Sequence, residues 1–131
     1  MPHRKDIVIV GAGCEGRIAL DILRELGRRA KVLGFLDACA GRGDIPARVA
    51  GLPVLGDERL LPGLRRKGVR RVVVALGDNA RRAELARAAE EAGLTLLSLI
   101  HPSAVVSGGA KAGEGCIIHA GCVIGVDASL G

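Results

Sequence analysis

Aromatic side chains are almost absent from this sequence of 131 residues, which has no Trp, no Tyr and one Phe. Proteins that bind single-stranded nucleic acid or RNA stack the bases on aromatic rings. The net charge of +5 therefore does not predict a nucleic-acid partner. A small anionic ligand such as a nucleotide fits the positive charge equally well.

Long apolar runs are also missing, since the longest, such as residues 7–10 and 72–76, are far shorter than the ~20 residues that cross a bilayer. The first residues lack the extended apolar stretch and cleavage site of a signal peptide. These absences predict a cytoplasmic protein with no membrane partner.

The four cysteines include no Cys-x-x-Cys pair and are too sparse for a disulfide framework, which predicts reduced thiols. His101 and His119 have no acidic partners at the spacing of metal ligands. We therefore expect no metal site.

Between residues 5 and 100, short β-rich segments alternate with helical patterns, which predicts an α/β fold with a parallel sheet covered by helices. The expected strands are 6–10, 31–36, 51–56, 72–76 and 95–100, and the expected helices are 17–26, 57–67 and 80–92, with Asp57 as a cap. Residues 38–50 lack either periodicity and predict an exposed loop. Pro53 predicts that 51–56 is an edge strand, because proline cannot donate to a central ladder.

Beyond His101 and Pro102 the apolar pattern repeats every six residues, in two columns. One column is Val106, Ala112, Ile118, Ile124 and Leu130, and the other is Ala104, Ala110, Cys116, Cys122 and Ala128. Such a repeat is typical of a parallel β-helix. We therefore expect a first domain over 1–101 and the first, incomplete repeats of a β-helix over 102–131.

The segment from Gly11 to Gly16 matches G-x-G-x-x-G between an expected strand and an expected helix, and Asp37 ends the next strand. Gly11 permits a tight turn, Gly13 leaves room for phosphates, and Gly16 allows close packing of a helix whose N–H groups face the anion. Asp37 would accept hydrogen bonds from a ribose or base, in a Rossmann-like arrangement. Alternatively, the glycines merely close a turn and Asp37 is a solvated strand end.

Gly77, Asp78 and Asn79 follow another parallel strand and are expected at the same sheet edge as the glycine loop. Asn79 and Arg82 would then reach the same ligand. Equally, Asp78 or Asn79 caps the helix that follows. Cys14 lies within the glycine loop, where its side chain would pack against the ligand.

Several motifs in this order give the whole chain a resemblance to a known family. They are residues 9–13, 34–37, 51–56, 75–79 with Arg82, and 99–104. Together they resemble the nucleotide-sugar acyltransferases that include the sialic acid O-acetyltransferases and the UDP-4-amino-sugar N-acetyltransferase of bacillosamine synthesis.

The resemblance implies that the first domain binds a UDP-sugar rather than NAD. The loop from Gly11 to Gly16 would face the diphosphate and Asp37 the uridine, while Gly77, Asn79 and Arg82 would lie between nucleotide and sugar. In this family a left-handed β-helix forms a homotrimer and binds acetyl-CoA between subunits. A histidine base then helps transfer the acyl group to a sugar amine or hydroxyl.

Two departures from the family modify these expectations. Cys14 and Glu15 replace a common glycine and histidine, and a carboxylate at that position repels an anion. The family's catalytic histidine belongs to a later coil, so neither His101 nor His119 matches it. We expect a truncated chain that binds the sugar nucleotide without turning it over. The competing hypotheses are an NAD(P)-binding domain and a non-catalytic oligomerising scaffold.

Overall fold

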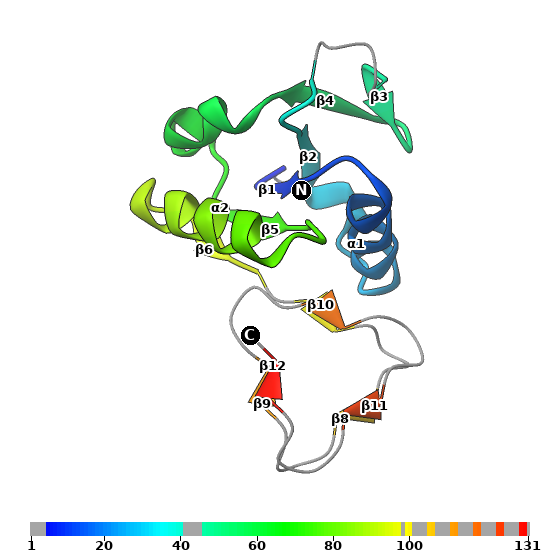
Figure 1. Cartoon of the computed structure of the whole chain (residues 1–131). Helices are drawn as coiled ribbons and strands as arrows, with labels where there is room; N and C mark the ends of the chain where they lie inside the picture. Colours follow the sequence, from blue (N-terminus) through cyan, green and yellow to red (C-terminus); the bar gives the residue numbers. More distant parts are fainter. Residues whose placement is uncertain are drawn as a thin grey trace.

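A computed structural model describes residues 5–40, 46–97 and 99–100, together with the backbone of five two-residue strands further along. Six strands form one sheet in the order β3-β4-β2-β1-β5-β6 (Figure 1). They are β1 (Ile7–Val10), β2 (Val32–Leu36), β3 (Arg48–Val49), β4 (Leu52–Gly56), β5 (Arg71–Val74) and β6 (Thr95–Leu96). Every neighbouring pair is parallel except β3 with β4. This confirms the α/β expectation and makes the sheet mixed rather than wholly parallel.

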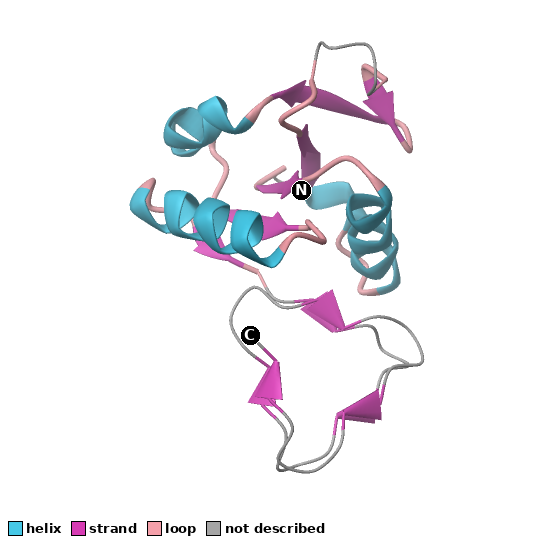
Figure 2. Ribbon diagram, viewed as in Figure 1, coloured by secondary structure: helices cyan, strands magenta, loops and turns pink. Residues whose placement is uncertain are grey.

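The central strand β1 is buried on both faces, as parallel strands covered by helices are. Ile7 and Ile9 belong to the apolar cluster beneath α1 (Cys14–Glu25). Val8 and Val10 belong to the opposite cluster, beneath α2 (Asn79–Glu91) and the 3-10 helix η2 (Glu58–Lys67). Helices therefore cover both faces of the sheet (Figure 2). None of the helices in the described part of the chain is long and apolar enough to cross a membrane.

The helix α1 begins at Cys14, three residues before the predicted start. Its N-cap is Gly13, which has extended backbone geometry and makes no side-chain cap hydrogen bond. The apolar spacing that we used for prediction marks only the buried face and therefore missed the exposed first turn. After α1 the chain makes the short 3-10 helix η1 (Arg29–Lys31) and enters β2.

The predicted loop over 38–50 contains a strand, and the predicted edge strand is interior. β3 pairs antiparallel with β4, with Arg48 opposite Pro53, so that β3 is the sheet edge. A two-residue turn joins them, and both of its residues, Ala50 and Gly51, have positive φ. In the pairing with β3, the N–H donor next to Pro53 is Val54, which donates to the carbonyl of Ala47 at 2.8 Å. Pro53 therefore removes no hydrogen bond between β3 and β4.

Aspartates cap η2 and α2, the two helices that cover the face of the sheet with Val8 and Val10. Asp57 accepts a hydrogen bond from the N–H of Arg59 and begins η2, as predicted, but the helix is 3-10 and contains Pro62, which lacks an N–H. The expected strand 72–76 is Arg71–Val74, and the expected helix 80–92 is Asn79–Glu91, with Asp78 as its cap.

The single strand expected over 95–100 is two strands in different sheets. β6 (Thr95–Leu96) pairs with β5, whereas β7 (Leu99–Ile100) pairs with β10 (Ile117–Ile118). The same parallel pairing, three six-residue repeats apart, joins β8 (Val105–Val106) to β11 (Val123–Ile124) and β9 (Lys111–Ala112) to β12 (Ser129–Leu130). The second residue of each of these strands from β8 on belongs to the large apolar column of the repeat. The small column lies outside the described residues.

Candidate functional site

The glycine loop follows β1 at the carboxyl edge of the sheet, and two of its glycines have no room for a side chain. Gly11 has a φ of +110°, and a Cβ there would collide with the carbonyl oxygen of Ala75, just beyond β5. A Cβ on Gly16 would collide with the carbonyl oxygen of Gly11. Both positions therefore require glycine, as the motif predicts. At Gly16 the helix packs on the backbone of Gly11 and beside the side chain of Phe35 in β2.

Gly13 differs from these two glycines because it is exposed and nothing lies within 4 Å of a Cβ built on it. It is the N-cap of α1 and, as a glycine, has no side chain that could accept a hydrogen bond from the first N–H groups of the helix. Cys14, the first helical residue, is also exposed. The loop thus presents open backbone beside the positive end of a helix dipole, an arrangement that suits an anion.

Asp37 ties the glycine loop to the end of β2. One carboxylate oxygen accepts a hydrogen bond from the N–H of Ala12, and the other accepts one from the N–H of Cys39, both at 2.9 Å. The carboxylate is part-buried and retains further lone pairs for a ligand hydroxyl. The interpretation of Asp37 as a merely solvated strand end is therefore wrong.

A small crevice of about 130 Å³ opens at this edge of the sheet. We call it the sheet-edge crevice. It is lined by Val10, Gly11, Asp37, Ala38, Glu58, Leu76, Arg81 and Leu85. The first six end or follow β1, β2, β4 and β5, and the last two lie in the first half of α2. Open α/β sheets bind their ligands in this position, outside the carboxyl ends of the strands.

One ion pair spans the crevice. The guanidinium of Arg81, in the first turn of α2, donates through Nη2 to Glu58 Oε1 at 2.5 Å, and through Nη1 to Glu84 at 3.1 Å. The hydrogen bond to Glu58 raises the pKa of Arg81 above its ordinary value, which keeps the guanidinium charged. The side chains of Arg81 and Glu58 are 34% and 31% exposed, so both remain within reach of a ligand.

The other predicted residues lie near the crevice but do not line it. Gly77 and Asn79 are exposed, and Arg82 is half-buried in the first turn of α2. The capping question is resolved in favour of Asp78, whose carboxylate accepts a hydrogen bond from the N–H of Arg81 at 3.1 Å. The structure therefore brings Gly11 and Asp37 together in one crevice, whereas Gly77, Asn79 and Arg82 are not among the residues that line it.

Sequence analysis missed Glu58 and Arg81. Glu58 follows a strand that we took for the sheet edge, although the carboxyl ends of all the parallel strands meet at one edge. Arg81 stands beside Arg82, and no pattern distinguished the two arginines. The position of Asp78 as N-cap is the signal that orients α2 and places Arg81 over the crevice.

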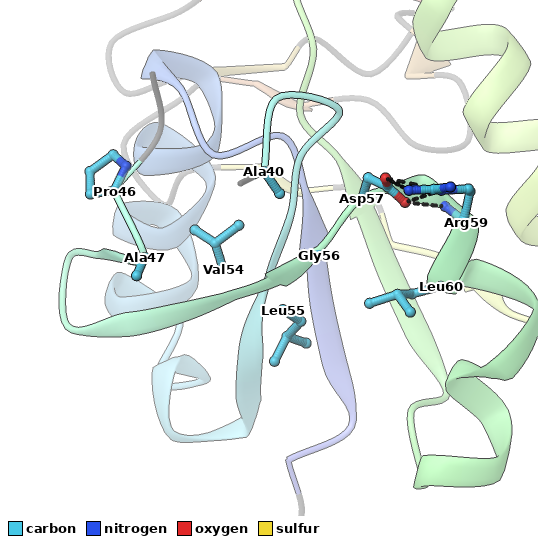
Figure 3. Close-up of a pocket in the computed structure, with 9 residues that line it drawn as sticks. All are labelled: Ala40, Pro46, Ala47, Val54, Leu55, Gly56, Asp57, Arg59 and Leu60. Atoms are coloured by element: carbon cyan, nitrogen blue, oxygen red, sulfur yellow. Dashed lines mark hydrogen bonds and ion pairs between the residues drawn. The ribbon is translucent and has the colours of Figure 1, made fainter. Parts of the chain in front are cut away.

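A second hollow of about 620 Å³ lies beside β4 and the start of η2 (Figure 3). Its walls are mostly apolar, and its charged residues Asp57 and Arg59 are paired with each other at 2.9 Å. It does not include the glycine loop. We therefore place the candidate site at the sheet-edge crevice and the adjoining loop.

Several sequence predictions fall on residues that the structure does not describe. His101 and His119 are among them, as are Cys116 and Cys122. The side chains of the repeats, where the resemblance implies an acetyl-CoA site, also lie outside the described residues.

The solved structures that are similar to this chain include those of PerB and PglB. PerB from Caulobacter crescentus, in a structure described as a complex with CoA and GDP-perosamine, is 39% identical with a TM-score of 0.81. The match covers 94% of this chain and 55% of PerB. The acetyltransferase domain of PglB from Neisseria gonorrhoeae, described in complex with acetyl coenzyme A, is 28% identical with a TM-score of 0.76, over 97% and 58% of the two chains.

This chain thus spans little more than half the length of either relative. No curated protein matches it. The family model described as the PglD N-terminal domain matches residues 6–89, which include the glycine loop, Asp37 and the start of α2. Because this match spans most of the sequence, the chain belongs to the PglD N-terminal domain family.

Proposed function

We propose that this chain binds a nucleoside diphosphate sugar at the sheet-edge crevice and glycine loop. The observation that carries the proposal is the open backbone at Gly13, the N-cap of α1, in a loop that is tied through Ala12 to Asp37. In this arrangement the diphosphate lies on the loop and the ribose hydroxyls donate to Asp37. Gly77, Asn79 and Arg82, which adjoin the lining residues Leu76 and Arg81 in the sequence, then face the sugar, and Cys14 packs beside the diphosphate.

The bound sugar is the acceptor for acetyl transfer from acetyl-CoA. The similarity to PerB and PglB, which are described with CoA and acetyl coenzyme A, supports this part of the proposal. The sequence predictions of a left-handed β-helix, a homotrimer and an acetyl-CoA site between subunits belong to it as well. The parallel pairing at intervals of three repeats supports the β-helix, because one turn of a three-sided helix has that length.

The family resemblance and the structure of PerB point to different nucleotide bases. The family resemblance implies uridine, whereas the structure of PerB is described with GDP-perosamine. Both bases suit a crevice with apolar walls and a few polar groups. A nucleoside diphosphate sugar of either kind satisfies the proposal.

Calorimetric titration tests the proposal, because the chain has no Trp or Tyr to report binding by fluorescence. The ligands are a UDP-N-acetyl-sugar, GDP-mannose as an available GDP-sugar, and NADH. We expect saturable heat with at least one sugar nucleotide and none with NADH. Binding of NADH alone would favour a nicotinamide domain, and self-association without any binding would favour a scaffold.

A further inference from the structure

The sheet-edge crevice has apolar walls and one polar end. Val10, Leu76 and Leu85 contribute apolar surface from β1, the end of β5 and α2. Glu58 and Arg81 also line it, with a carboxylate and a guanidinium in direct contact. A flat base fits such a space, since its faces pack on apolar side chains while its edge meets polar groups.

The crevice also lies where a base should lie if the proposed function is correct. Asp37, which would receive the ribose, belongs both to the crevice and to the contact with the glycine loop. A nucleotide with its diphosphate on the loop and its ribose at Asp37 would therefore direct its base toward Glu58 and Arg81. This step rests on the proposed function.

Both side chains retain hydrogen-bonding capacity for a ligand. The guanidinium of Arg81 has five N–H donors, of which its contacts with Glu58 and Glu84 use two. The Glu58 carboxylate offers about four lone-pair sites and accepts one of these bonds. Asp78 and Glu84 hold Arg81 from outside the crevice, through its backbone N–H and its Nη1.

We propose that the Glu58–Arg81 pair reads the base and selects guanine over uracil. The edge of guanine carries two adjacent donors, the N1–H and the 2-amino group, beside the acceptor O6. One carboxylate accepts from both donors, and an arginine N–H donates to O6. Uracil offers a single donor, N3–H, between two carbonyl oxygens, one of which would face the second oxygen of Glu58.

Calorimetric titration of the whole chain with GDP, inosine diphosphate and UDP tests this inference. Inosine lacks only the 2-amino group of guanosine. We expect GDP to bind about tenfold more tightly than inosine diphosphate or UDP, the effect of one good charged hydrogen bond. In Glu58→Gln the affinity for GDP should fall to that for inosine diphosphate.

The matched control is Glu84→Gln, which removes the other side-chain partner of Arg81 but leaves the crevice lining unchanged. It should retain the preference for GDP. Circular dichroism of each variant confirms that it is folded, and the ratio of the GDP and inosine diphosphate affinities is measured within one variant. Equal binding of the three nucleotides, or a preference that survives Glu58→Gln, would overturn the inference and leave the proposed function standing. Binding of none of them would overturn both.

Discussion

The carboxylate of Asp37 accepts a hydrogen bond at 2.9 Å from the N–H of Ala12, which lies 25 residues earlier within the glycine loop. Its other oxygen accepts a bond from the N–H of Cys39, also at 2.9 Å. Asp37 therefore has a structural role in the absence of any ligand. The same carboxylate fixes the loop that would receive the diphosphate and stands where the ribose would bind.

Replacing Asp37 with alanine should reduce both stability and nucleotide affinity. The substitution leaves the N–H groups of Ala12 and Cys39 without their acceptor, which costs about 1–3 kcal/mol of unfolding free energy. Urea unfolding followed by circular dichroism measures this. The matched control is Asp21→Ala on α1, whose side chain is 69% exposed and should change stability by less than about 0.5 kcal/mol. Equal effects of the two substitutions would contradict the structural role of Asp37.

Two glycines of one motif should behave in opposite ways. Gly16→Ala places a Cβ against the carbonyl oxygen of Gly11 and should destabilise the chain by about 2 kcal/mol or more. Gly13→Ala meets no atom and should cost less than about 1 kcal/mol at this N-cap position. Its Cβ would instead obstruct the diphosphate and weaken nucleotide binding about tenfold. Thermal unfolding and calorimetric titration separate the effects, and unchanged binding in Gly13→Ala would place the phosphates elsewhere.

Substitutions of two neighbouring residues at the start of α2 should likewise have separate effects, one on stability and the other on binding. Asp78→Ala removes the side-chain cap and should lower the unfolding free energy by about 1 kcal/mol. Asn79→Ala removes an exposed side chain that does not cap the helix, so the same unfolding measurement should show little change. If Asn79 contacts the ligand, its substitution should weaken the binding of a nucleotide sugar. A larger loss of unfolding free energy in Asn79→Ala than in Asp78→Ala would contradict the observed cap.

Leu99 should matter to the stability of the sheet domain although its strand pairs with the repeats. Its side chain is 1% exposed and belongs to the cluster beneath α1, while the backbone of β7 pairs with β10. Leu99→Ala should cost about 2–5 kcal/mol. Leu26→Ala, at a position that is 39% exposed, is the control and should cost much less. Comparable losses in urea unfolding would show that Leu99 does not join the core.

The sequence predicted the elements whose buried faces repeat with a regular period. One example is β1, which has apolar residues on both faces. The loop from Gly11 to Gly16 was predicted as well, because its glycines form a motif within one short segment. The strands β8 to β12 recur every six residues, which is the period of the apolar pattern in the sequence. Asp37 was also correctly placed at the end of β2, although its bond to Ala12 depends on tertiary contact.

The remaining features depend on contacts between distant segments. β3 was missed because it has two residues and is joined to β4 by Ala50 and Gly51, a turn that Arg29 and Arg48 support with hydrogen bonds to its carbonyl oxygens. The Glu58–Arg81 pair joins residues 23 apart on two helices. No local pattern could predict that pair without the packing of η2 on α2.

The most direct measurement of the central claim is the change in the backbone amide NMR spectrum when a nucleotide sugar is added. We predict that the largest chemical-shift changes fall on residues 11–16 and 37, because the diphosphate would meet the N–H groups of the loop and the ribose would meet Asp37. Changes concentrated around Asp57 and Arg59, in the larger hollow, would contradict the assignment of the site to the glycine loop.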